Sequence, residues 1–136
     1  MKLIQGTSRP DRMIREGEPM PRPIIPAMPR GLVRAARHTW RRLSPILGRV
    51  GLLTEADREQ FAALCQAWAR YDAASVRLQT TLALEEKRQA TIAAWGPVEQ
   101  HEMAGRIRTA EVSVERAELS FRLLANEFGL SPAARS

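Results

Sequence analysis

Four arginines recur at intervals of three or four residues near the start of the chain: Arg30, Arg34, Arg37 and Arg41. At about 100° per residue of α-helix, this spacing places them in one narrow stripe. Guanidinium groups bind phosphate through two parallel hydrogen bonds, and each neutralised phosphate releases counterions. The stripe therefore predicts a salt-sensitive contact with a phosphate backbone that carries little sequence information. The alternative is a solvated basic face that only keeps the helix soluble.

Positive charge is concentrated in the first third of the chain. Residues 1–49 hold 11 Lys and Arg against 3 Asp and Glu, a net charge of +8, whereas residues 50–136 carry a net charge of −2. Such an asymmetry favours a polyanion partner at the N-terminal end, most often nucleic acid. The residues that we expect to contact DNA are Arg9, Arg12, Arg30, Arg34, Arg37, Arg41, Arg42 and Arg49.

The sequence contains no motif typical of a catalytic or metal site. It has no GxxxxGK[ST] phosphate loop and no HExxH pair, and its single cysteine and two histidines are too few for a Cys/His metal site. We therefore expect no enzymatic activity, no metal and no cofactor. One cysteine fits a reducing cytosol, and no apolar stretch approaches membrane-spanning length, so we expect a soluble intracellular protein without a membrane partner.

Proline and apolar periodicity divide the chain into an arm, a helical domain and a tail. Six prolines lie within residues 1–30, which we expect to be a flexible basic arm. Residues 31–128 are expected to form the helical domain, and residues 129–136 a C-terminal tail. The first helix is predicted at about 32–47, closed by Pro45 and by glycines at 48 and 51.

Two longer helices are predicted to follow. The second, at about 55–85, begins at the N-cap Thr54 with Asp57 at the capping-box position. Its apolar stripe comprises Phe61, Leu64, Trp68, Tyr71, Ser75, Leu78 and Leu82. The third, at about 98–128, has a heptad seam of Met103, Ile107, Ala110, Val114, Ala117, Phe121, Leu124 and Phe128, and Gly129 should end it. The predicted fold is all-α, a short N-terminal helix followed by a long antiparallel helical hairpin across Gly96-Pro97.

The third helix is long for so small a chain. At 1.5 Å per residue it extends for roughly 40 Å, so neighbours are expected to cover part of it. The residues that we expect to support oligomerisation are Phe61, Leu64, Trp68, Ile107, Val114, Phe121 and Leu124. Periodicity alone leaves open whether these stripes pack within one chain or against copies of it. Cys65, on the buried side of the second helix, is expected to be a small core residue.

Several stretches resemble a known family when they are taken together and in order. They are "GTSRPDR" near the start, "RAARHTWRRLSPIL", "GLLTEADREQFAALCQAWARY" and the final "FGLSPAARS". The chain resembles the small terminase subunit of tailed double-stranded DNA bacteriophages, of the compact all-helical kind. One departure is that the family commonly has Asn-Pro before its last helix, where this chain has Gly96-Pro97.

The resemblance implies a non-enzymatic component of the genome-packaging motor. Such subunits form homo-oligomeric rings in the host bacterial cytoplasm, bind double-stranded viral DNA and deliver it to the terminase large subunit, which holds the ATPase and nuclease activities. On this hypothesis the hairpin builds the ring, the arginines of the first helix meet DNA, and the C-terminal tail is available to the large subunit.

Two other classes of protein are compatible with the same residues. A helix, a short turn and a second helix across residues 32–70 could form a helix-turn-helix, which would make the chain a DNA-binding regulator. Such a regulator would dimerise through the heptad seam of the third helix and prefer a short palindromic site. A structural adaptor of the phage particle would instead leave the arginine stripe without any DNA contact.

Overall fold

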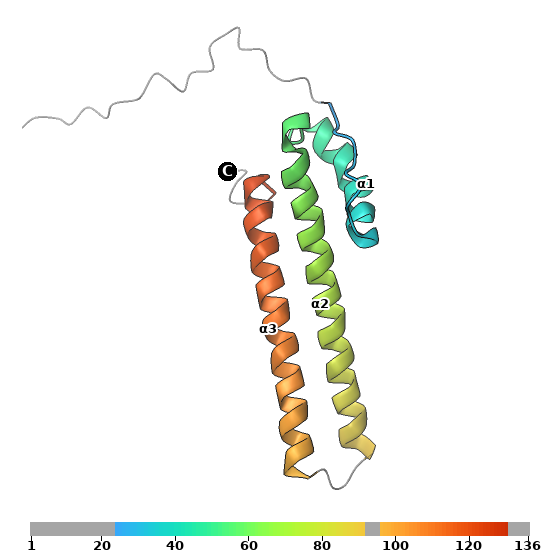
Figure 1. Ribbon diagram of the computed structural model, residues 1–136, viewed down its shortest axis with the longest axis vertical. Coiled ribbons are helices and arrows are strands. Elements are labelled where there is room, and N and C mark those ends of the chain that lie inside the picture. Colours follow the sequence, from blue (N-terminus) through green and yellow to red (C-terminus); the bar gives the residue numbers. More distant parts are fainter. Residues whose placement is uncertain (1–23, 92–95, 131–136) are drawn as a thin grey trace, which may run out of the picture.

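The computed structural model describes residues 24–91 and 96–130. Its helices are α1 (Arg34–Arg49), the 3-10 turn η2 (Glu55–Asp57), α2 (Arg58–Thr91) and α3 (Pro97–Glu127). The two long helices α2 and α3 lie side by side, and α1 packs beside the first part of α2 (Figure 1). The described residues contain no strand, which confirms the all-helical prediction.

The molecule has two parts that differ in the number of helices they contain. The head comprises residues 24–75 and 114–130, where α1, α2 and α3 meet. The stalk comprises the described residues 76–91 and 97–113, where α2 and α3 run side by side without α1 (Figure 1). The proline break after Gly96 starts α3, as predicted, because a proline at the first helical position leaves no intrahelical hydrogen bond unmade.

Aromatic rings hold the head together. Phe61 on α2 is fully buried, and its ring centroid lies 4.5 Å from that of Trp40 on α1 and 5.8 Å from that of Phe128 after α3. A second set joins α2 to α3, because the ring centroid of Phe121 lies 5.2 Å from that of Trp68 and 6.4 Å from that of Tyr71. One side chain, Phe61, therefore links α1 and α2 to the residue that directly follows α3.

Helix α1 ends in a glycine that adopts a left-handed conformation. Gly51 has φ of 72°, and the next residue, Leu52, donates its N–H to the carbonyl of Leu47 at 2.9 Å. This is a Schellman ending, in which the reversed chain caps carbonyls that the last turn leaves free. The glycine prediction is thus confirmed, but Pro45 and Gly48 lie inside α1 and do not end it.

Helix α3 ends in the same way. Gly129 has φ of 63°, and Leu130 donates its N–H to the carbonyl of Ala125 at 3.0 Å. Leu130 also packs against the core cluster of the head. The predicted stop at Gly129 and the return of Leu130 onto the last turn are therefore confirmed.

The start of α2 is capped as its sequence predicts. A carboxylate oxygen of Asp57 accepts a hydrogen bond from the backbone N–H of Thr54 at 2.8 Å and another from its hydroxyl at 2.7 Å. These contacts hold the short turn η2, from which α2 continues. The helix extends to Thr91, six residues beyond the predicted limit at 85, because no glycine or proline interrupts it before Gly96.

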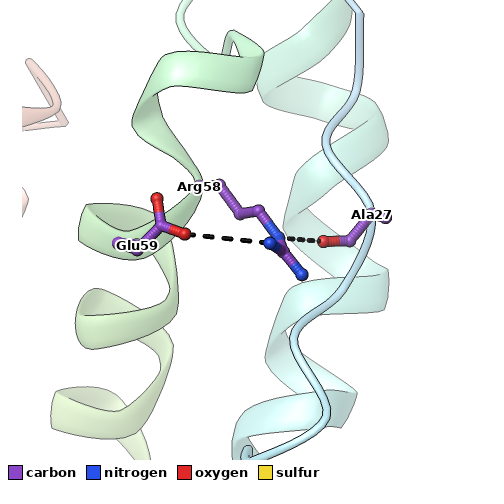
Figure 2. Close-up of polar contacts among 3 residues, drawn as sticks. All are labelled: Ala27, Arg58 and Glu59. Carbon is purple, nitrogen blue, oxygen red and sulfur yellow. Dashed lines mark hydrogen bonds and ion pairs between the residues drawn. The ribbon is translucent and has the colours of Figure 1, made fainter.

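An extended segment at residues 24–33, here called the strap, lies along α1 (Figures 1 and 2). The side-chain Nε of Arg58 on α2 donates a hydrogen bond to the carbonyl of Ala27 at 2.8 Å. Pro26 and Leu32 are buried, and a Cβ on Gly48 would come within 2.7 Å of the Ile25 side chain. Residues 25–27, in the later part of the predicted arm, therefore contact the helical domain, and residues 1–23 of that arm lie outside the described residues.

The stalk is much less buried than the head. Among its described side chains only Met103 is buried, while Val76, Leu82, Leu84 and Val98 are exposed. The predicted stripe of α2 is wrong at Leu82, which is 45% exposed. A helical hairpin with no third layer leaves at least half of each helix open to solvent, which explains the difference.

Candidate nucleic-acid interface

Helix α1 presents one basic side and one buried side. Arg34, Arg37 and Arg41 are exposed, whereas Ala36 and Trp40 are buried against the rest of the head. The helix carries five arginines and no acidic residue. We call the exposed arginines of this helix the basic face of α1; its members are Arg34, Arg37, Arg41, Arg42 and Arg49.

None of these five arginines forms an ion pair within the described residues, and one carboxylate, Asp72 on α2, lines the same hollow as Arg34. The ion pairs of Arg58, Arg108 and Arg122 all lie outside α1. The N-cap residue of α1 is Val33, which has no side-chain oxygen, and the first turn holds no acid. A helix N-terminus attracts anions, so an acid-free helix that carries five arginines presents a positive surface.

Arg49, at the end of the basic face, and the predicted DNA contacts outside α1 lie in three different settings. Arg49 bonds its own helix, since its Nε donates to the carbonyl of Pro45 at 3.4 Å. Arg30 is exposed but lies in a turn before α1, so its assignment to the helical stripe is wrong. Arg9 and Arg12 lie outside the described residues.

Arg42 lies close enough to the core to affect a buried thiol. Burial raises the pKa of Cys65 to about 12, and the positive charge of Arg42 opposes part of that rise. A thiol with such a pKa stays protonated at neutral pH and is a poor nucleophile. The prediction that Cys65 is a core residue is confirmed, since its exposed fraction is 0%.

The residues predicted to support oligomerisation pack largely within the single chain. Phe61 and Leu64 belong to the core of the head, and Trp68 and Phe121 contact each other across α2 and α3. Ile107, Val114 and Leu124 are half-buried on α3. The heptad seam of α3 therefore faces α2 of the same chain, so a dimer through this seam, as the regulator hypothesis requires, would have to displace α2.

The structure also assembles arginines that the sequence analysis did not group. Two adjoining hollows between α2 and α3 share Arg77, and we call them together the arginine groove. One is also lined by Arg106, and the other by Arg34, Arg70 and Arg116. The sequence could have indicated part of this group, because Arg70 and Arg77 are seven residues apart and therefore lie on one side of a helix. Their meeting with α3 depends on the register of the hairpin.

Neither a metal site nor a membrane-spanning helix is found in the described part of the chain. Within residues 24–91 and 96–130, no group of three or more His, Cys, Asp or Glu side chains is placed to hold a metal ion. No helix of these residues is both long and apolar enough to cross a membrane.

Comparison with known families identifies the class of the protein. Residues 36–136 match the family model described as phage terminase, small subunit. The match includes nearly all of α1 and the whole hairpin, and the chain therefore belongs to this family. No curated protein and no solved structure matches it significantly.

Proposed function

We propose that this chain is the DNA-recognising, non-catalytic subunit of a phage genome-packaging motor. It binds double-stranded viral DNA, assembles into a homo-oligomeric ring and recruits the terminase large subunit, which supplies the ATPase and nuclease activities. It acts in the host bacterial cytoplasm, without a cofactor and without a membrane partner. The family match supports this setting.

The basic face of α1 is the observation that carries the DNA contact. Five arginines on a helix without a carboxylate attract a polyanion, and none of them forms an ion pair within the described chain. Arginine binds phosphate oxygens bidentately, so this face suits a duplex backbone better than a set of base edges. Specificity for a packaging site would then come from DNA shape or from residues before the strap.

Ring assembly and large-subunit recruitment are supported by other parts of the molecule. The stalk exposes apolar side chains along both of its helices, which favours contact with neighbouring copies. The predicted tail, residues 129–136, begins at the end of α3, where Gly129 turns the chain and Leu130 packs on the head. We propose that this tail binds the large subunit.

The DNA contact is tested by comparing two double variants. Arg37→Ala/Arg41→Ala removes two guanidinium groups from the basic face of α1, and Arg108→Ala/Arg122→Ala removes two from α3, where both are paired with glutamates. Fluorescence anisotropy with a labelled duplex would be recorded at salt concentrations from about 50 to about 200 mM. We expect the first variant to bind more weakly, with a salt slope lower by about 0.9 for each phosphate that it no longer neutralises.

The control variant should retain most of the affinity and the full salt slope, because its arginines lie away from α1. Equal affinities and slopes for the first variant and the unmodified chain would contradict the proposed contact. Absence of any salt-dependent DNA binding by the unmodified chain would favour the adaptor hypothesis instead. A strong preference for one short palindrome, bound by a dimer, would favour the regulator.

A further inference from the structure

The arginine groove continues the basic face of α1 along the hairpin. Arg34 belongs to both surfaces, because it lies on α1 and also lines one of the two hollows of the groove. The same hollow is lined by Arg70, Arg77 and Arg116. Arg77 also lines the adjoining hollow, which extends to Arg106 in the stalk, where α2 and α3 lie side by side (Figure 1). The positive surface therefore extends from α1 onto the two long helices.

The guanidinium groups of the groove are open to an anion. All five of its arginines are exposed. None of them forms an ion pair within the described residues, where the ion pairs of α3 involve Arg108 and Arg122, which do not line the groove. Glu102 is the one carboxylate of the described lining, so the groove carries a net charge of +4. A polyanion is the ligand that such a surface attracts.

The rest of the lining suits a nucleic acid better than a protein helix. Much of it is small: Ala73, Ala74, Gly105, Ala110, Ser113 and Ala117. The largest apolar side chains among the described lining residues are Val33 and Val76, and no aromatic ring is among them. Protein interfaces are usually centred on aromatic or other large anchors, whereas protein–DNA interfaces are more polar and more positively charged.

The same lining favours a duplex over a single strand. Proteins that bind single strands stack the bases on aromatic side chains, which the described lining lacks. Arg106 and Arg116 are ten residues apart, which is about 15 Å along α3. At about 3.4 Å per nucleotide of one strand of a duplex, this length corresponds to about four nucleotide steps. We infer that the arginine groove binds the phosphate backbone of a DNA duplex.

This inference rests on the proposed function and extends the DNA contact from α1 to the hairpin. Arginines that bind phosphates fix the position of the duplex but read little of its sequence. The groove therefore contributes affinity and salt dependence rather than the choice of a packaging site. It also places part of the DNA beside the stalk, so that the bound duplex contacts both parts of the molecule.

A pair of double variants tests the groove. Arg77→Ala/Arg106→Ala removes one guanidinium group from each wall of the groove. Arg108→Ala/Arg122→Ala is the matched control, because it removes the same charge from two positions that do not line the groove. Arg106 and Arg108 are two residues apart and therefore roughly 200° apart around α3.

Three measurements would be made on the full chain and on each variant. Fluorescence anisotropy would follow binding to a labelled duplex, and to a single strand of the same length, at about 50 to about 200 mM salt. Native mass spectrometry would give the size of the assembly, and circular dichroism would show whether the helices remain.

We expect the groove variant to keep its native mass and to bind the duplex about tenfold more weakly at about 100 mM salt. Its salt slope should be lower by about 1.8, which is about 0.9 for each of two phosphates. The control should keep the affinity and the slope of the unmodified chain. A second groove variant, Arg70→Ala/Arg116→Ala, should show the same loss, so the result does not depend on the folding of one variant.

Four results would overturn the inference. Groove variants that keep the affinity, slope and mass of the unmodified chain would make the groove a solvated surface; the proposed function survives this result if Arg37→Ala/Arg41→Ala weakens binding. Loss of the large assembly in the groove variants would assign the groove to a contact between copies. Tighter binding of the single strand than of the duplex would exclude the duplex. If the unmodified chain binds no DNA, the inference fails together with the DNA contact of α1.

Discussion

The head and the stalk are built from the same two long helices, yet they differ in how those helices are buried. In the head, α1 and the strap add a third layer, and Phe61, Leu64 and Cys65 are at most 1% exposed. In the stalk, the helices have only each other, and Met103 is the only buried side chain described there. A long apolar stripe therefore gives a core only where a further element covers it.

This contrast suggests different roles for the two parts: the head provides most of the stability of the fold, and the stalk offers surfaces to other copies of the chain. The head should be stabilised within one chain, because its aromatic rings are packed and both helix ends are capped. The stalk gains little from burial, and its exposed apolar residues suit association with copies. The contrast can be tested by paired substitutions, one in each part.

The largest effect is expected at the centre of the head. Phe61→Ala removes a ring that contacts both Trp40 and Phe128, so it should lower the free energy of unfolding by about 3–5 kcal/mol. The matched change in the stalk is Leu84→Ala, which removes a side chain that is 52% exposed and should change stability by less than about 0.5 kcal/mol. Urea unfolding followed by circular dichroism measures both. Similar losses would mean that the stalk is as important for stability as the head.

A smaller effect on stability is expected when alanine replaces Gly105, inside α3, or Gly129, just after it. Gly129→Ala forces a side chain into a left-handed conformation in the head, with an expected loss of about 1–2 kcal/mol. Gly105→Ala lies inside the helix in the stalk, where an added Cβ meets no atom within 4 Å, and should stabilise the helix by about 0.5–1 kcal/mol. Thermal unfolding of the two variants should move in opposite directions, and a shift in the same direction would contradict this account.

A third effect should appear only at high pH, in the head. The pKa of Cys65 is raised from 9.0 to about 12, so the folded state keeps a proton that the unfolded chain loses. The resulting stabilisation is complete below pH 9 and is lost as the pH rises toward 12, by up to about 1.4 kcal/mol per pH unit.

Comparison with Cys65→Ala isolates this effect, because the other groups that titrate above pH 9 are shared by both proteins. Urea unfolding at pH 7, 9 and 10 should show a steeper loss for the unmodified chain than for the variant. Parallel pH dependence of the two would show that the thiol is not shielded. A thiol-specific reagent at pH 8 offers a second measurement, since it should label Cys65 slowly in the folded protein and rapidly in urea.

Sequence signals that act over a few residues predicted most of the helix ends. The capping pair Thr54 and Asp57 involves residues only three positions apart, and the stop at Gly129 depends on that glycine and its neighbours. The local sequence was therefore enough to predict both helix ends. Pro45 misled the prediction because a proline inside a helix is usually unfavourable, yet here α1 continues through it. Packing on α2 and on the strap outweighs the hydrogen bond that proline cannot make.

Long-range arrangement was less accessible from sequence. Residues 24–30 of the strap were assigned to a flexible arm because their prolines exclude helix, whereas the position of this segment involves a hydrogen bond from Arg58, far along the chain. The basic face of α1 was predicted because its residues lie on one helix. The arginine groove was not, since it needs the register between α2 and α3, which no single helix encodes.

The strap also fixes the position from which the preceding residues of the chain extend. Because Ala27 is held to Arg58 and Leu32 is buried, residue 24 leaves the head at a defined position beside α1. An extended chain covers at most about 3.3–3.6 Å per residue, so Arg9, fifteen residues earlier, stays within roughly 50 Å of that point. Confinement to such a radius raises the local concentration of arginine around any ligand already bound to α1. A DNA segment bound to α1 would then be within reach of the arginines that precede the strap, without a second diffusional encounter.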